Sequence, residues 1–277
     1  MTTPPFEAFG ATAEPVRLAG GKGGTWRAGD LVLKPVEYLP ETLWRAEVLD
    51  RLPENPAFRV ARPVRATDGA WVADGWEATR FLPGSPDVAR PDDVLRAGIA
   101  FHAAVAGLDR PAFLDVRDDP WSNGDRVAWE ESPLHGSAPH TSPPHTSPPH
   151  TSPLATGLLQ PLLEARRPVT LAAQAVHGDL AGNVLFAAGL PPAVIDWPLY
   201  WRPPSWASAV AVADALCWYG AGPDLAERWS HQPEWPQMLI RALIYRIVTH
   251  DHTSGLVGQA DSYRPAITLT VSLSTER

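Results

Sequence analysis

Four polar side chains surround two short apolar runs in the middle of the chain. They belong to His177, Asp179, Asn183 and Asp196. The first three precede the apolar run 184–186, and the fourth directly follows the run 194–195. Residues 187–192 between the runs contain glycine and proline, which predicts a small hairpin. Hairpin pairing would bring Asn183 and Asp196 together at one end, with Asp179 on the loop that leads in.

Side chains of these types, gathered at one edge, could carry out phosphoryl transfer. The amide oxygen of Asn183 and the carboxylate of Asp196 are hard ligands of the kind that Mg²⁺ uses when it carries phosphates. His177 and Asp179 are then the candidate catalytic residues of the loop, with Asp179 accepting the proton of an attacking hydroxyl. The alternative is that these side chains only cap the loop and the strand end, as Asp and Asn do in many turns.

The H-G-D at 177–179, the following Asn183 and the I-D-W at 195–197 resemble the catalytic loop and metal-binding segment of a known group. This is the aminoglycoside phosphotransferase and choline kinase group of small-molecule kinases. The resemblance implies a two-lobed, protein-kinase-like α+β fold with an antiparallel-sheet N-lobe and a mainly helical C-lobe. It also implies ATP and Mg²⁺ as cofactors and a small-molecule acceptor. One feature differs: the group usually separates its Asp from its Asn by five positions, whereas Asp179 and Asn183 are four apart.

The resemblance covers nearly the whole chain. Segments similar to TWRAGDLVLKP, FRVARPVRA, HGDLAGNVLF and RALIYRIVT occur in the same order in an actinobacterial branch of the aminoglycoside phosphotransferase-like proteins. Only a repetitive insertion, described below, lies outside it. The resemblance implies a fold and a reaction, but it does not identify the acceptor.

A glycine-rich turn comes early in the chain, between strands expected within residues 18–34. Its centre consists of Gly21, Lys22, Gly23 and Gly24. Because glycine has no Cβ, such a turn lets backbone N–H groups approach phosphates closely, so we expect these residues to cover the nucleotide. The turn is not a Walker A loop, since neither Ser nor Thr follows Lys22. The alternative is an ordinary hairpin turn.

The next apolar strand, residues 30–36, carries Lys34. A lysine on the third strand after a glycine turn resembles the kinase lysine that contacts the α- and β-phosphates of ATP. Its ion-pair partner is expected on the helix 41–52, where Glu47 lies between members of the apolar face. Glu47 could instead be a solvated surface carboxylate. Glu41 is a weaker candidate, because it fits a charge that answers the dipole at a helix start.

Two further strands would complete a five-stranded antiparallel sheet with one helix. They are expected at 58–64 and 70–81, joined by the turn Asp68-Gly69. Residues 78–81 resemble the connection between kinase lobes, where backbone groups bind the adenine edge. The breaker L-P-G-S-P at 82–86 then marks the lobe boundary.

An N-lobe of residues 1–82, which binds the nucleotide, would therefore precede a C-lobe of residues 83–277 with the catalytic loop and the acceptor site. Its helices are predicted over 91–108, 154–167, 205–219, 236–250 and 256–277. His102 is interpreted as a packed core histidine. Asp214 lies in an apolar helix and needs hydrogen-bond partners there, and the resemblance gives it the role of holding the catalytic-loop backbone. Residues 201–204 are expected to form a turn.

Residues 137–153 contain three copies of the pentapeptide PHTSP. A proline-rich tandem repeat of this kind cannot bury a core, so we interpret it as an extended or flexible insertion with no catalytic part. Its three histidines could be taken for a metal site, namely His140, His145 and His150. Metal ligands need a scaffold that fixes their geometry, which argues against that interpretation.

Composition fits a globular enzyme. With 277 residues, of which 44% are hydrophobic, the chain is long enough for one large domain or two lobes. The net charge of −8 favours neither nucleic acid nor an anionic membrane surface as partner. The single cysteine, Cys217, lies in an apolar run and suits a reducing compartment, so a cytoplasmic protein is expected. Neither a secretion signal nor an apolar run long enough for a membrane span is present, and the sequence does not indicate the oligomeric state.

The sequence thus predicts an ATP-dependent kinase that phosphorylates a hydroxyl of a small molecule such as an aminoglycoside, amino sugar or aminoalcohol. A first alternative is a pseudokinase, a nucleotide-binding or regulatory module, which the short Asp179 to Asn183 spacing favours. A second is a metallophosphoesterase, but that class needs a D-x-H element and clustered histidine ligands, which the chain lacks outside the repeat. The residues considered for the wall of the acceptor cleft are Trp201, Asp224, Glu227 and Trp235.

Overall fold

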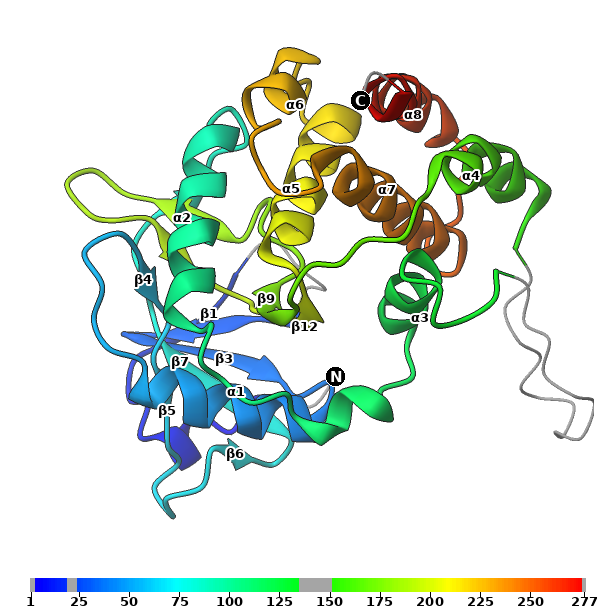
Figure 1. Cartoon of the computed structure of the whole chain (residues 1–277). Coiled ribbons are helices and arrows are strands. Elements are labelled where there is room, and N and C mark those ends of the chain that lie inside the picture. The colour runs from blue at the N-terminus through cyan, green and yellow to red at the C-terminus, as the bar shows by residue number, and fades with distance from the viewer. Residues whose placement is uncertain (1–2, 19–23, 135–150, 276–277) are drawn as a thin grey trace, which may run out of the picture.

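An antiparallel sheet with one helix beside it forms the N-terminal part of the protein (Figure 1). The computed structural model describes residues 3–18, 24–134 and 151–275. The sheet has the order β1-β2-β3-β7-β5, and β6 also pairs with β7. Its strands are β1 (Pro15–Arg17), β2 (Trp26–Ala28), β3 (Leu31–Pro35), β5 (Pro63–Val64), β6 (Val72–Ala73) and β7 (Trp76–Arg80). Since β5 and β6 pair with successive residues of β7 on its free side, the expected five-strand width is reached.

Side chains alternate between the two faces of this sheet, as they must on extended strands. Leu33 on β3 and Trp76 on β7 are buried in a small core with Phe9 of the short 3₁₀-helix η1 (Glu7–Phe9). The intervening positions Lys34 and Glu77 are only partly buried and lie on the opposite face. The alternation therefore turns these two charged side chains away from the small core.

Helix α1 (Leu39–Arg51) follows β3 and confirms the predicted helix at 41–52. Pro40 stands in its first turn, where its missing N–H costs nothing. The helix ends at Leu52, which has an extended backbone and precedes Pro53. Leu49 and Leu52 pack into the main core of the C-terminal part, so the helix touches both halves of the molecule.

The predicted strand at 58–64 is wrong as a single element. Its first half, β4 (Arg59–Val60), pairs in parallel with β11 (Ala193–Val194), whereas β5 joins the N-terminal sheet. The second sheet therefore has the order β4-β11-β10-β8, with β8 (Ser85–Pro86) and β10 (Val184–Phe186). Because β4 and β8 precede the catalytic loop by about a hundred residues in sequence, this small sheet ties the early chain to the central hairpin.

The predicted strand at 70–81 is also divided. A tight turn at Asp74 and Gly75 separates β6 from β7, and both residues have positive φ angles of 48° and 78°. An Asp-Gly pair is a known signal for such a turn, and the same signal at Asp68-Gly69 predicts the turn before β6. The central hairpin β10–β11 is confirmed. A strand pair that the sequence did not predict, β9 (Gln174–His177) with β12 (Leu199–Arg202), includes Trp201 and Arg202, which were expected in a turn.

Helices build the rest of the molecule (Figure 1). They are α2 (Pro91–Ala104), η2 (Ala112–Asp115), α3 (Pro120–Ala128), α4 (Pro153–Ala165), α5 (Pro204–Trp218), α6 (Asp224–Arg228), α7 (Trp235–Asp251) and α8 (Ala260–Thr275). The five predicted C-terminal helices correspond to α2, α4, α5, α7 and α8, and α3 and α6 are additional. Among the described residues, none of the helices combines the length and the apolar character that a membrane crossing requires.

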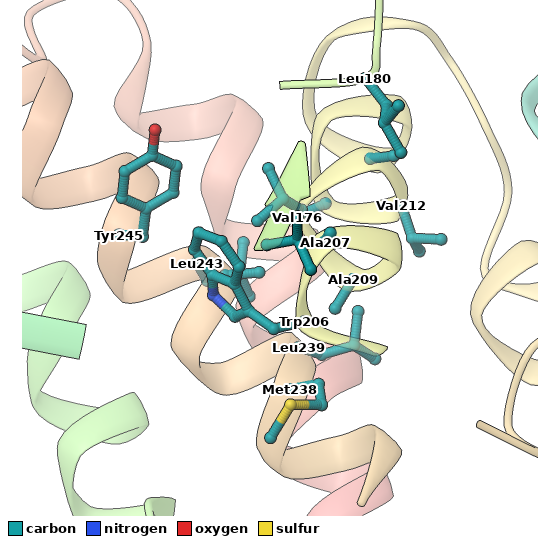
Figure 2. Close-up of a cluster of buried hydrophobic side chains, with 14 of the residues drawn as sticks. Val176, Leu180, Trp206, Ala207, Ala209, Val212, Met238, Leu239, Leu243 and Tyr245 are labelled. Atoms are coloured by element: carbon teal, nitrogen blue, oxygen red, sulfur yellow. The ribbon is translucent and has the colours of Figure 1, made fainter. Parts of the chain in front are cut away.

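The main core lies between α5 and α7, which are buried on nearly all sides. Figure 2 shows Trp206 of α5 beside Leu243 of α7. Val176 of β9 and Leu180, just after it in the catalytic loop, reach into the same cluster. The loop therefore rests on the main core.

The repetitive insertion falls mostly outside the described residues, because 135–150 are not among them. Its last residues are described and have structural roles. Thr151 Oγ1 donates a hydrogen bond of 2.7 Å to the carbonyl of Leu134, so the two ends of the insertion meet. Ser152 caps α4 and binds the carboxylate of Asp251 on α7, with its N–H at 2.8 Å and its hydroxyl at 2.6 Å.

Candidate functional site

The β10–β11 hairpin brings the two predicted metal ligands to one end, as its sequence predicted. Val184 pairs with Val194, and the N–H of Ile195 donates a 3.0 Å hydrogen bond to the carbonyl of Asn183. Asp196 follows directly and has a left-handed backbone with φ of 51°, which is uncommon for a residue with a Cβ. This turn of the backbone sets the direction in which the Asp196 carboxylate leaves the strand.

Both ring nitrogens of His177 are engaged by the backbone of the loop and the hairpin. Its side chain is fully buried. Nε2 lies 2.9 Å from the carbonyl of Ile195, to which it can only donate, so Nδ1 accepts the 3.1 Å hydrogen bond from the N–H of Asp179. Burial lowers the pKa of His177 and keeps the ring neutral. The histidine thereby links the backbones that lead into Asp179 and Asp196.

The middle residue of the H-G-D motif must be glycine for a steric reason. A Cβ at Gly178 would overlap the ring of Tyr200 on β12. Similarly, a Cβ at Gly98 of α2 would overlap Leu180 of the loop. His102, also on α2, accepts a 3.0 Å hydrogen bond from the N–H of His177 and is buried, in agreement with its interpretation as a core residue.

Both oxygens of the Asp179 carboxylate accept hydrogen bonds. Arg246 Nη2 of α7 lies 2.6 Å from Oδ1, and Asn183 Nδ2 lies 3.1 Å from Oδ2. The same amide nitrogen also donates to the carbonyl of Asp179 at 2.7 Å. The four-residue spacing therefore closes a turn between Asp179 and Asn183. Since the nitrogen of the Asn183 amide faces Asp179, the amide oxygen faces away from it.

Asp214 acts on Asp179 through Arg246, and not on the loop backbone as expected. Asp214 of α5 is buried and accepts two hydrogen bonds from Arg246, from Nε at 2.7 Å and from Nη2 at 2.5 Å. Burial alone would lower the pKa of Arg246, but Asp214 and Asp179 outweigh it and raise that pKa well above its usual value. Arg246 therefore stays charged and bridges the two carboxylates. Sequence reasoning missed Arg246, although the two arginines of a mostly apolar helix, Arg241 and Arg246, are a visible signal.

Lys34 projects from β3 as predicted, but its partner is different. Its ammonium group forms an ion pair with Asp196. The predicted pair with Glu47 is wrong, because Glu47 lies on a side of α1 that does not face Lys34. It accepts a 2.7 Å hydrogen bond from Trp71 Nε1. That hydrogen bond lowers the pKa of Glu47. Arg51, one helical turn further on, also contacts Glu47 at 2.8 Å.

The face of α1 that looks toward the site carries Glu41 and Arg45, one turn apart. Glu41 lies in the first turn of α1, as its interpretation as a helix-start charge predicts, and it is also buried. It accepts a 2.7 Å hydrogen bond from the N–H of Leu199 and one of 3.3 Å from Arg117. Arg45 Nη2 lies 2.7 Å from Glu77 Oε1 on β7. Burial alone would lower the pKa of Arg45, but Glu77 and Glu41 outweigh it and raise that pKa.

Most of the predicted phosphate-covering turn lies outside the described residues, including Gly21, Lys22 and Gly23. The strands on either side pair as predicted, and Leu18 N–H donates to the Thr25 carbonyl at 3.0 Å. Gly24 packs against Pro35, where a Cβ would approach the proline ring to 3.1 Å. The hairpin is therefore present, and its role toward phosphate stays a prediction.

The acceptor wall proposed from the sequence is partly wrong. Trp235 is fully buried and donates to the Ala226 carbonyl at 2.8 Å, so it cannot line a cleft. Trp201 is half-buried on β12, and Asp224 and Glu227 are exposed on α6. A small, mostly apolar pocket opens beside the catalytic loop instead. It is lined by Val88, Val94, Ala181, Gly182, Ala215 and Tyr219, among others.

The donor set at the hairpin end suits a magnesium ion that also binds phosphates. Asp196 offers a carboxylate that is nearly half exposed, and the amide oxygen of Asn183 is turned away from Asp179. Both are hard oxygen donors, as Mg²⁺ prefers. Within the described ranges, no cluster of three or more His, Cys, Asp or Glu side chains could hold a metal by itself. Phosphate oxygens would therefore have to complete the coordination.

Solved structures with a similar fold are kinases of small molecules. An aminoglycoside phosphotransferase from Alicyclobacillus acidocaldarius has 15% identity and a TM-score of 0.55, covering 100% of this chain and 98% of its own. Spectinomycin phosphotransferase, in complex with ADP and spectinomycin, has 12% identity and a TM-score of 0.56 over 92% of each chain. Choline kinase from Streptococcus pneumoniae has 11% identity and a TM-score of 0.56 over 96% of each chain. The chain has the fold of the aminoglycoside phosphotransferases.

This likeness confirms the predicted two-lobed, protein-kinase-like α+β fold. At the level of sequence, no protein-family model matches the chain, and no curated protein matches it. Similarity at these low sequence identities shows the fold and does not indicate the substrate. What the protein does must therefore be argued from its own side chains.

Proposed function

We propose that the protein is an ATP-dependent phosphotransferase that acts on a hydroxyl group of a small molecule. The observation that carries the proposal is the meeting of Lys34 from the sheet with Asp196 from the hairpin, next to Asn183 and Asp179. A cation from one lobe and oxygen ligands from the other are the parts that phosphoryl transfer needs, because this reaction depends on positioning and charge neutralisation.

Each side chain then has a distinct task. Lys34 binds the α- and β-phosphates. Asp196 and the amide oxygen of Asn183 would hold a magnesium ion, which neutralises charge on the phosphates. Asp179 orients the acceptor hydroxyl through a hydrogen bond and then accepts its proton. Each carboxylate oxygen can accept a second hydrogen bond beyond those from Arg246 and Asn183.

The nucleotide would lie between an N-lobe of residues 1–82 and a C-lobe of residues 83–277. Backbone groups after β7 would bind the adenine edge there, where the chain approaches the hairpin closely. A Cβ at Gly84 would come within 2.9 Å of the carbonyl of Phe186, and Gly84 has a φ of 137°, so only glycine suits this position. Solved relatives in fold bind spectinomycin or hygromycin B, which supports a small-molecule acceptor such as an amino sugar or aminoalcohol.

A second candidate is a nucleotide-binding module without phosphoryl transfer. Arg246 favours it, because the arginine engages one carboxylate oxygen of Asp179 and leaves less of that carboxylate open to an acceptor hydroxyl. The short spacing between Asp179 and Asn183 points the same way. Turnover distinguishes the two functions.

A magnesium-dependent ADP-release assay with a panel of amino sugars, aminoalcohols and nucleosides tests the proposal. We expect one acceptor class to stimulate ADP release in the wild type, and Asp179→Asn to remove that stimulation. ATP binding without acceptor-dependent turnover across the panel would favour the binding module, and failure to bind ATP at all would contradict both candidates.

A further inference from the structure

Lys34 needs a second carboxylate if the proposed function is correct. In this structure its ammonium group is bound to Asp196, which is also the proposed metal ligand. A divalent cation and an ammonium group compete for the same carboxylate, because both are attracted to its negative charge. A lysine released from Asp196 would need another anion to hold it toward the phosphates. The helix residue Glu47 cannot serve, since it faces Trp71.

Glu77 on β7 is placed to take this role. In the antiparallel ladder of β3 and β7, Lys34 is the direct partner of Glu77. Directly opposed residues have Cβ atoms about 4.5–5.5 Å apart and point to the same face of a sheet. That distance is well within the reach of a lysine side chain. The residue pairs before and after it, Leu33 with Ala78 and Pro35 with Trp76, are also direct partners, so the register is set on both sides of the lysine.

The Glu77 carboxylate is already fixed by Arg45. Arg45 Nη2 binds Oε1 at 2.7 Å, and the side chains of Arg45 and Glu77 are only 21% and 17% exposed. Arg45 also reaches the carbonyl of Trp197 at 3.4 Å, and the ring of Trp197 packs at 5.3 Å from that of Trp44. Helix α1 therefore contributes a cation at this point, and the strand contributes the carboxylate.

We propose that Glu77 is the positioning residue that holds Lys34 toward the phosphates when a nucleotide is bound. Arg45 keeps Oε1 of Glu77 in place, and within the described part of the chain no hydrogen bond engages Oε2, which can receive the lysine. The inference rests on the proposed function, because it needs a nucleotide site. It assigns to a strand residue the task that the sequence assigned to Glu47 on the helix.

Calorimetric titration with MgADP and, separately, with adenosine tests the role of Glu77. Glu77→Gln should weaken MgADP binding about tenfold or more, the usual worth of a hydrogen bond to a charged group, and should leave adenosine binding unchanged. The matched control Glu47→Gln should change neither affinity by more than about twofold, since Glu47 lies away from Lys34. A Glu77→Gln variant that binds adenosine less well, too, would show a general structural role and overturn the proposal.

A double variant makes the test independent of folding effects. In a Lys34→Met background, Glu77→Gln should weaken MgADP binding by less than about twofold, because the partner is already gone. A full effect in that background would contradict the pairing. If wild type binds MgADP and Glu77→Gln binds it equally well, the inference fails while the proposed function stands. If wild type binds no nucleotide, both fall.

Discussion

The two aspartates of the site, Asp179 and Asp196, lie at the same edge of the C-lobe but are held in opposite ways. Asp179 is bound to Arg246, which is buried and bound in turn by the buried Asp214. Asp196 is bound to Lys34, and the Lys34 side chain is 28% exposed and that of Asp196 45%. One carboxylate is therefore anchored to the core of the C-lobe, and the other is attached to a flexible side chain from the opposite lobe.

The difference corresponds to what each residue must do in the proposed reaction. A group that orients the acceptor hydroxyl works best when it does not move, because misplacement lowers the rate steeply. A metal ligand at Asp196 must instead release the ammonium group of Lys34 and bind the metal ion in each turnover. The buried Arg246–Asp214 pair behind Asp179 suits the first task, and the more exposed partner of Asp196, Lys34, suits the second.

The largest expected effect concerns the anchor of Asp179. Arg246→Met should lower the free energy of unfolding by about 3–5 kcal/mol, because it leaves Asp214 as an unpaired charge in the core. Lys34→Met, which breaks the exposed pair at Asp196, should cost less than about 1 kcal/mol. Urea denaturation of both variants measures the two effects. Equal losses would contradict the distinction between a fixed and an exchangeable carboxylate.

A smaller effect should appear in the pH dependence of stability, through the histidine beneath the Asp179 loop. Burial, with a smaller contribution from His177, lowers the pKa of His102 to about 3. A histidine in an unfolded chain has a pKa of about 6.5. Below that pH the unfolded chain therefore binds a proton at His102 that the folded protein does not bind. Stability should thus fall as the pH decreases from about 6.5 to 3, by up to about 1.4 kcal/mol per pH unit from this group.

The matched comparison for His102 uses two variants. His102→Gln should reduce the slope of the unfolding free energy against pH between 6.5 and 4 by up to about 1.4 kcal/mol per pH unit, which corresponds to one proton. The matched control is His231→Gln, which changes an exposed histidine. An identical slope in His102→Gln and wild type would show that His102 is protonated in the folded protein.

The smallest expected effect belongs to the repetitive insertion. Replacing residues 137–150 with two glycines should change the free energy of unfolding by less than about 1 kcal/mol, since loop closure depends weakly on length. The replacement must stop before Thr151 and Ser152, because these hold Leu134 and Asp251. Ser152→Ala alone should cost about 1 kcal/mol through loss of the α4 cap. A shortened loop that costs more than the lost cap would show that the repeat is structural.

The hairpin end of the site could be predicted from the sequence because its geometry is local. Residues 177–196 contain the loop, both strands and their connection, so spacing alone indicates that Asn183 and Asp196 meet. The same holds for α1, α2, α5 and α7, whose apolar patterns and proline starts define them. The sequence-based predictions were wrong where a residue's partner lies far away along the chain.

The ion-pair partners show why. Whether Glu47 or Arg45 faces the site depends on the rotation of α1 about its axis. That rotation is fixed by contacts of Glu41 with Leu199 and of Leu49 with the C-lobe core. Likewise, β4 leaves the N-terminal sheet because β11, more than a hundred residues later, offers it an edge. No pattern within residues 41–64 contains this information.

The central claim is that Asp196 holds the metal and Asp179 orients the acceptor, and calorimetry combined with an ADP-release assay tests it most directly. Asp196→Asn should abolish the magnesium-dependent part of ATP binding, because the phosphates lose their counter-ion. Asp179→Asn should bind MgATP like wild type while turnover falls by roughly 10²- to 10⁴-fold, the usual worth of a positioned base. Equal loss of MgATP binding in both variants, or full turnover in Asp179→Asn, would contradict the account.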